Sequence, residues 1–76
     1  MAIPRSSLAA NKRLGRNISR LRQNAGLTQD KFAELLEITP RYLQKLENGM
    51  HAPSLPILIN VRKKLGAGWA ELLDGL

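Results

Sequence analysis

The sequence contains no cysteine and a single histidine, so it has little with which to bind a metal or attack a substrate. Without thiols, a disulfide framework, a thiolate nucleophile and a thiolate metal site are all excluded. The six acidic residues form no paired constellation, and no glycine-rich loop follows a strand pattern. We interpret His51 as a loop residue rather than a metal ligand. The sequence therefore predicts a protein that is not an enzyme, with no cofactor, no metal and no small-molecule substrate.

Long hydrophobic runs are also missing. The longest, LPILI, contains a proline and is far too short for a signal sequence or a membrane span. The acid-free start, with its Arg and Ser residues, slightly resembles an organelle transit peptide, but it continues into a helix whose apolar positions a compact domain needs. We expect a cytoplasmic protein with no membrane partner, and 76 residues predict a single domain.

Acidic residues are absent from the first third of the chain, and basic residues are not. The net charge is +6. Residues 27–76 balance their charges, so the whole excess lies in residues 1–26. Such an asymmetry favours a polyanion as partner, either nucleic acid or an anionic membrane, although it can also serve solubility alone. The basic residues of this first part are Arg5, Lys12, Arg13, Arg16, Arg20 and Arg22.

The apolar residues recur at helical spacing, and no stretch alternates with a period of two. We predict an all-α chain of five helices. The first spans residues 7–24, preceded by a flexible N-terminal arm at residues 1–6, so that residues 7–76 form one domain. A fourth helix follows the capping residue Ser54, and a fifth begins near Trp69.

The second and third helices begin in the same way. Thr28 and Thr39 are predicted N-caps, each preceded by an apolar residue that can pack onto the first turn, and Pro40 suits the first helical position. These signals predict helices over residues 29–36 and 40–48. Two short helices with so short a connection must cross at a steep angle, which is a helix-turn-helix.

The third predicted helix has two different faces. Leu43 and Leu46 form a stripe that suits burial, while Arg41, Lys45 and Asn48 cluster around the opposite pole with Gln44 at their edge. These are the side chains that read base edges and bind phosphates in a major groove. A donor-rich face can also be simply a solvated face, but the steep turn before it favours a recognition helix.

A buried ion pair is predicted by the same periodicity. Glu47 borders the apolar stripe of the third helix, where an unpaired carboxylate would be costly. Arg22 borders the apolar stripe of the first helix. We therefore expect Arg22 and Glu47 to pair and to tie these two helices together.

From about residue 21 to residue 73 the chain resembles a known family. The stretches LRQNAGLTQDKFAELLEITPRYLQKLENG, PSLPILINVRKKLG and WAELL are similar to the helix-turn-helix domains of phage repressors and Cro proteins, the Xre-like family. The resemblance implies a five-helix, lambda-repressor-like domain that binds double-stranded operator DNA, usually as a homodimer on a palindromic site.

Matching positions imply roles for individual residues. The base-reading set is Thr39, Pro40, Arg41, Tyr42, Gln44 and Lys45, with Tyr42 and Gln44 at its margins. The phosphate-binding set is Thr28, Gln29 and Asn48, joined by Arg5 on the predicted arm. Arg22 and Glu47 match the family's internal ion pair.

Three residues depart from the family pattern. Glu37 occupies a turn position usually held by glycine, so it must either adopt a left-handed conformation or be accommodated by a shifted turn. Arg62 replaces a commonly small residue in the fourth helix. Pro40 stands where many relatives have a hydrogen-bonding side chain, which predicts an apolar contact there, such as one to a thymine methyl group.

One alternative keeps the fold without reading DNA, as a protein-interaction module. The apolar C-terminal residues Trp69, Leu72, Leu73 and Leu76 could then form a binding patch, and equally a dimer interface or core. We interpret Trp69 as core rather than as a stacking platform. Among DNA binders, a Cro-like repressor, an antitoxin acting as autorepressor and a restriction-modification controller all remain open.

Overall fold

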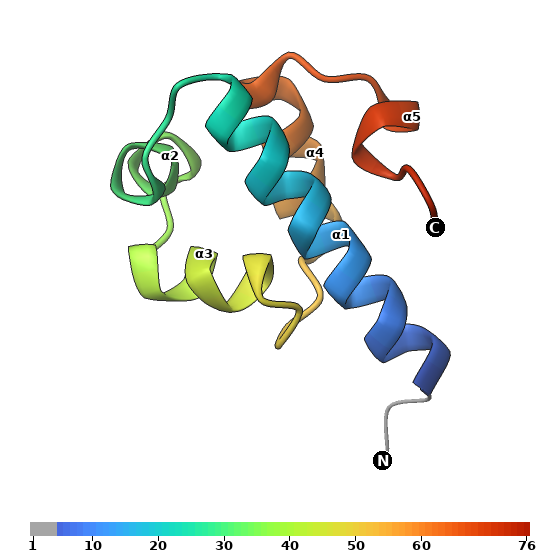
Figure 1. Cartoon of the computed structure of the whole chain (residues 1–76). Helices are drawn as coiled ribbons and strands as arrows, with labels where there is room; N and C mark the ends of the chain where they lie inside the picture. The colour runs from blue at the N-terminus through green and yellow to red at the C-terminus, as the bar shows by residue number, and fades with distance from the viewer. Residues whose placement is uncertain (1–4) are drawn as a thin grey trace.

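The computed structural model describes residues 5–76, with side chains from Ser7 onward, and this part of the chain contains five α-helices and no strand. This confirms the predicted all-α fold. Figure 1 shows α1 crossing in front of α4, with α2 and α3 on one side and α5 on the other. The helices are α1 Arg5–Asn24, α2 Gln29–Leu36, α3 Pro40–Glu47, α4 Leu55–Leu65 and α5 Trp69–Leu72.

The long helix α1 is the centre of the fold, since it contacts α3, α4 and α5, while α2 contacts α3 and α4. The core contains side chains from every helix. It is built from Leu14, Ile18, Phe32, Ala33, Leu36, Leu43, Val61 and Leu72. The predicted apolar stripe of α3 is confirmed, because Leu43 and Leu46 are both buried.

The beginning of α1 differs from the prediction. The helix starts at Arg5, two residues earlier than expected. Residues 1–4 of the predicted arm lie outside the described part of the chain, as does the side chain of Arg5. The phosphate contact predicted for Arg5 therefore stays a prediction.

The two predicted N-caps are confirmed by hydrogen bonds. The Thr28 hydroxyl accepts from the backbone N–H of Lys31 at 3.1 Å, and the Thr39 hydroxyl accepts from that of Tyr42 at 3.0 Å. Pro40 occupies the first turn of α3, where its missing N–H costs no hydrogen bond. Both helices thus begin where local chemistry places them.

The turn between α2 and α3 is made by a left-handed glutamate. Glu37 has φ 58° and ψ 39°, so the first of the two predicted alternatives holds. Its N–H donates to the Glu34 carbonyl at 3.1 Å, and the N–H of Ile38 donates to the Ala33 carbonyl at 3.0 Å. These bonds satisfy carbonyl groups at the end of α2 and turn the chain sharply into α3.

Replacing Glu37 by glycine should stabilise the protein. A side chain makes the left-handed conformation unfavourable, so Glu37→Gly is expected to raise the free energy of unfolding by about 1 kcal/mol. Urea denaturation followed by circular dichroism measures the change. Glu34→Gly is the matched control, because a glycine inside the exposed face of α2 should lower stability by about 1 kcal/mol. A loss of stability in Glu37→Gly would mean that its side chain makes a contact worth more than the strain.

The C-terminal end is held against α1 by two polar side chains that the sequence did not single out for this role. Asn17 is 2% exposed, and its amide donates to the carbonyls of Leu72 and Asp74, both at 2.9 Å. Arg13 donates to the Asp74 carbonyl at 3.0 Å and pairs with its carboxylate at 3.2 Å. The last residues are thereby fixed although α5 itself ends at Leu72.

The interpretation of Trp69 as core is wrong. Leu72 is fully buried, but Trp69 is 41% exposed and its ring lies under the Arg62 guanidinium, 5.1 Å from the ring centroid. This contact also shows how the long Arg62 side chain is accommodated on α4, where the family commonly has a small residue. The side chain leans outward over the indole, although its buried Nε has no hydrogen-bond partner in the described part of the chain.

Candidate DNA-binding surface

The donor-bearing face of α3 is open to solvent. Arg41, Gln44 and Asn48 are exposed, and Lys45 is half-buried. At the start of the helix, Thr39 and Pro40 are exposed as well. The described chain therefore leaves this face free for a ligand, which is the arrangement that a recognition helix requires.

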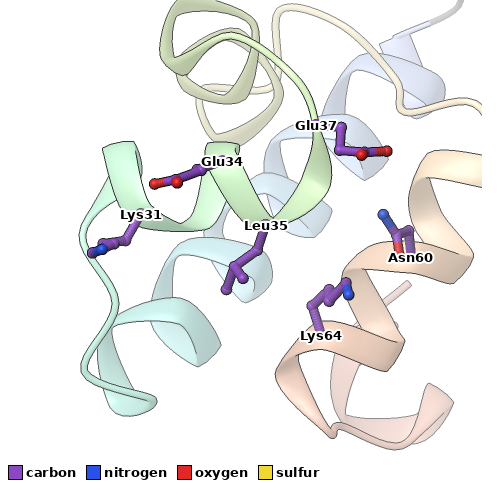
Figure 2. A pocket seen from close by; sticks show the side chains of 6 residues that line it. All are labelled: Lys31, Glu34, Leu35, Glu37, Asn60 and Lys64. Atoms are coloured by element: carbon purple, nitrogen blue, oxygen red, sulfur yellow. The ribbon is translucent and has the colours of Figure 1, made fainter.

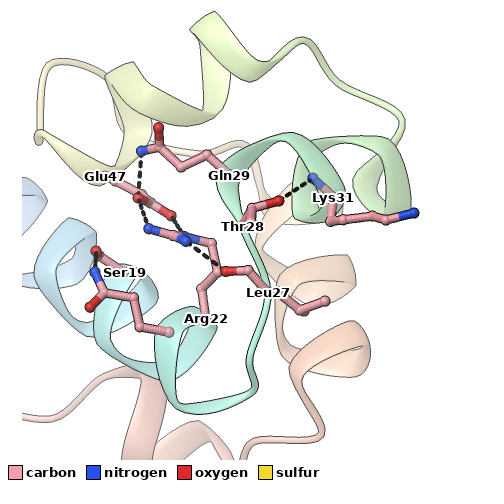
Figure 3. A network of polar contacts seen from close by, with 8 residues as sticks. Ser19, Arg22, Leu27, Thr28, Gln29, Lys31 and Glu47 are labelled. Carbon is pink, nitrogen blue, oxygen red and sulfur yellow. Dashed lines mark hydrogen bonds and ion pairs between the residues drawn. The ribbon is translucent and has the colours of Figure 1, made fainter.

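A polar network centred on Glu47 of α3 connects this helix to the start of α2 (Figure 3). Arg22 donates through Nε to one Glu47 oxygen at 2.7 Å and through Nη2 to the other at 3.2 Å. Its third nitrogen donates to the Leu27 carbonyl at 2.7 Å. The predicted ion pair is confirmed, and it is buried, with Arg22 at 8% and Glu47 at 7% exposure.

Gln29 belongs to the same network. Its amide donates to Glu47 Oε1 at 2.9 Å, so the side chain has a fixed direction in the free protein. One amide hydrogen and the amide oxygen remain available to other partners. The phosphate contact predicted for Gln29 thus has a preorganised donor at the N-terminus of α2, where the helix dipole also favours an anion.

Thr28 and Thr39 combine capping with exposure. Each hydroxyl oxygen accepts the N–H bond that caps its helix, which leaves the hydroxyl hydrogen free to donate outward. Both residues are exposed. They are compatible with the predicted contacts, Thr28 to a phosphate and Thr39 to a base, without loss of their caps.

Two glycines place α3 against α1, and sequence reasoning missed the first of them. A methyl group on Gly15 would meet the carbonyl oxygen of Leu46 at 2.6 Å and clash with that of Glu47. A methyl group on Gly49 would lie 2.7 Å from the Cα of Lys12. The spacing of apolar residues carries no signal of such contacts, because they are made by backbone rather than by side chains.

The basic residues of the first third of the chain differ in whether they form ion pairs. Arg22 and Arg13 form the two ion pairs present in the described part of the chain. Lys12, Arg16 and Arg20 are exposed and form none. The surplus charge predicted from the sequence therefore survives on the outer side of α1, where it can attract a polyanion.

A separate hollow of about 500 Å³ lies between α2 and α4 (Figure 2). Leu35, 44% exposed, points into the space between these helices, and the charges around it are mixed in sign. The lining residues of this hollow are Lys31, Glu34, Leu35, Glu37, Asn60 and Lys64.

The described residues contain neither a cluster of metal-binding side chains nor a membrane-spanning helix. No three His, Asp or Glu side chains gather in a way that could hold a metal ion. No helix has the length and apolar character that crossing a bilayer requires.

The fold and this surface define a helix-turn-helix domain, with α2 and α3 as its two helices. The chain matches the model of the helix-turn-helix family over residues 18–72 and belongs to that family, which includes the Xre- and Cro-like regulators. This is a family of DNA-binding transcription regulators and not of enzymes.

Individual relatives agree with this assignment. An uncharacterized HTH-type transcriptional regulator, y4dJ, from Sinorhizobium fredii (strain NBRC 101917 / NGR234) is 34% identical over 62 residues, which cover 82% of this chain and 80% of the relative. Two crystal structures of the clp gene regulator ClgR from Corynebacterium glutamicum superpose with a TM-score of 0.80 at 33% identity. They cover 84% of this chain and 82% and 68% of theirs.

Proposed function

We propose that this protein is a sequence-specific transcriptional repressor that inserts α3 into the major groove of a palindromic operator. The observation that carries the proposal is the exposed face of α3, which presents Arg41, Gln44 and Lys45 opposite a fully buried apolar stripe. Arginine and lysine suit guanine edges, and glutamine suits adenine, in the major groove. A cytoplasmic location follows from the proposal, because the repressor must reach its operator.

The proposed contacts fall into two groups. Base reading is assigned to Thr39, Pro40, Arg41, Tyr42, Gln44 and Lys45. Phosphate contacts are assigned to Thr28, Gln29, Asn48 and Arg5. The phosphate contacts set the position and orientation of α3 on the duplex, and the base contacts then supply the discrimination.

The proposed complex is a homodimer with one α3 in each of two successive major grooves, about 34 Å apart. Three exposed apolar side chains near the C-terminal end support a dimer. They are Trp69, Leu73 and Leu76, which are 41%, 38% and 54% exposed. We propose them as the contact between the two copies. Sedimentation of the protein on its own and on DNA would test the stoichiometry.

Selection of bound sequences from a random duplex pool tests the central proposal. The expected motif has two inverted half-sites whose centres are one helical turn apart. A motif without symmetry would contradict the homodimer, and the absence of any motif would favour the protein-interaction module. A reporter driven from the selected site would then separate repression from activation.

Replacing Arg41 by alanine should relax the specificity at one base pair. We expect a loss of about 1 to 3 kcal/mol on the preferred site and a much smaller loss on random DNA, since Arg41 is assigned to a base edge. Titrations of both duplexes at one salt concentration measure the two losses. Lys63→Ala is the control, because this exposed lysine lies on α4 outside the proposed surface. Equal losses on both duplexes would show that Arg41 binds only phosphate.

A further inference from the structure

The loop after α3 adds a ring to the proposed DNA-binding surface. His51 lies in this loop and stacks on Tyr42 of α3, with ring centroids 6.3 Å apart and ring planes within 5° of parallel. The sequence suggested only a loop residue at this position. The two rings come from points nine residues apart, so the contact needs a chain reversal between them.

Gly49 makes that reversal. It has φ +76°, its N–H donates to the Leu46 carbonyl at 3.2 Å, and the N–H of Met50 donates to the Lys45 carbonyl at 3.0 Å. These bonds close the end of α3 and turn the chain back along the helix. The His51 ring thereby lies beside the ring of Tyr42, a residue of the first turn of α3.

The paired rings share a hollow with the residues that are proposed to read DNA. It has a volume of about 250 Å³ and contains no acidic residue. Tyr42 is half-buried and His51 is exposed, and the parallel imidazole beside the phenol ring limits the orientations that this ring can adopt. The lining residues are Thr39, Arg41, Tyr42, Lys45, His51 and Ala52.

We propose that His51 is a positioning residue for base recognition, which holds the Tyr42 ring in the orientation that contacts a base. A ring fixed before binding loses less conformational freedom when the DNA arrives, and it favours one geometry of contact over others. His51 therefore sharpens the preference at the base pair next to Tyr42. This inference rests on the proposed function, because it assumes that α3 reads DNA.

The stack itself can be tested without DNA. Tyr42 is the only tyrosine of the chain, so its ring resonances are identified directly by NMR. His51→Ala should shift these resonances by removing the neighbouring ring current, whereas Met50→Ala should not. Met50 is a matched control, since it is in the same loop and 62% exposed. Unchanged Tyr42 resonances in His51→Ala would show that the rings do not stack in solution, and would overturn the proposal.

Selection from a random duplex pool then tests the function of the stack. We expect His51→Ala to lose about 2- to 10-fold of the discrimination at one base pair, the range of an aromatic pair, while other positions of the motif are unchanged. His51→Phe should restore the preference, because it keeps an aromatic ring and removes the imidazole nitrogens, which could otherwise donate to a phosphate. Met50→Ala should select the wild-type motif.

Three other outcomes of this selection would contradict either the positioning role of His51 or the proposed function. If His51→Ala selects the wild-type motif, the positioning role is wrong. If it weakens binding equally on all sequences and His51→Phe does not rescue, His51 binds a phosphate and the proposal is overturned. If the wild-type protein selects no motif, the proposed function itself fails, which the other two results do not imply.

Discussion

Replacing Arg22 by methionine is expected to destabilise the protein by about 3 to 5 kcal/mol, the usual cost of leaving one charge of a buried pair without its partner. Arg22 supplies two of the three hydrogen bonds that the Glu47 carboxylate receives, and Glu47 is only 7% exposed. In the variant, Gln29 would be its one remaining donor from a side chain. A domain of this size loses roughly 4 to 8 °C of melting temperature per kcal/mol, so thermal unfolding should shift by at least about 12 °C.

A double substitution separates the effect of the ion pair on stability from its effect on DNA binding through Gln29. In Arg22→Met combined with Glu47→Leu, no charge is left buried, and stability should return to within about 1 to 2 kcal/mol of the wild type. Gln29 would lose its hydrogen-bond partner in this double variant, because the leucine has no acceptor. DNA binding of the double variant should therefore stay weakened even where its stability recovers. An unchanged melting temperature in Arg22→Met would mean that solvent reaches Glu47 and that the pair is not needed for folding.

Gly15→Ala should have the second largest effect, because it forces α1 and α3 apart. The added methyl group would meet the backbone carbonyls of Leu46 and Glu47, which cannot move independently of α3. Overpacking of this kind typically costs about 1 to 3 kcal/mol, and more where only backbone is available to give way. An alanine would otherwise favour the helix over glycine by about 1 kcal/mol, so a net loss isolates the steric term. Urea denaturation measures it.

Gly68→Ala is the matched control for this substitution. Gly68 has an ordinary φ of −79°, and the nearest atom to its added methyl group is the Glu71 side-chain oxygen at 3.8 Å. The stability of Gly68→Ala should fall by less than about 1 kcal/mol, because Gly68 is the N-cap of α5 and alanine is a poorer N-cap than glycine. The DNA affinity of Gly15→Ala should fall at temperatures where it is still folded, since α3 would be displaced. A stable Gly15→Ala with wild-type affinity would contradict the close approach of the two helices.

The boundaries of α2 and α3 could be predicted because their signals are local. Thr28, Thr39 and Pro40 act within one turn of their own positions, and the apolar stripe of α3 repeats at the helical period. The Arg22–Glu47 pair was also predictable, since each residue borders a buried stripe and a carboxylate there needs a partner. The resemblance to the phage-repressor family is confirmed by the family match. It also supplied the proposed roles of individual residues, which periodicity could not predict.

The exposure of Trp69 was not predictable, because the apolar pattern of a four-residue helix does not say which side meets the core. The structure turns Leu72 inward and leaves Trp69 against Arg62. The roles of Asn17 and Gly15 also escaped the sequence. Each acts on the backbone of a segment that is distant along the chain, at Leu72 and Asp74 or at Leu46 and Glu47.

By itself, the sequence determined the five helices, the helix-turn-helix and the donor-bearing face of α3. Helix caps, helical periodicity and local charge depend only on residues that are close together in the sequence. Only the tertiary structure decided which basic side chains are used within the protein, how Gln29 is oriented, and that His51 returns to Tyr42. The physical reason is that these contacts depend on chain reversals and on backbone approaches. The backbone approaches arise from the packing of helices that are distant in the sequence, and the reversal at Gly49 needs a left-handed backbone conformation that the surrounding sequence permits but does not require.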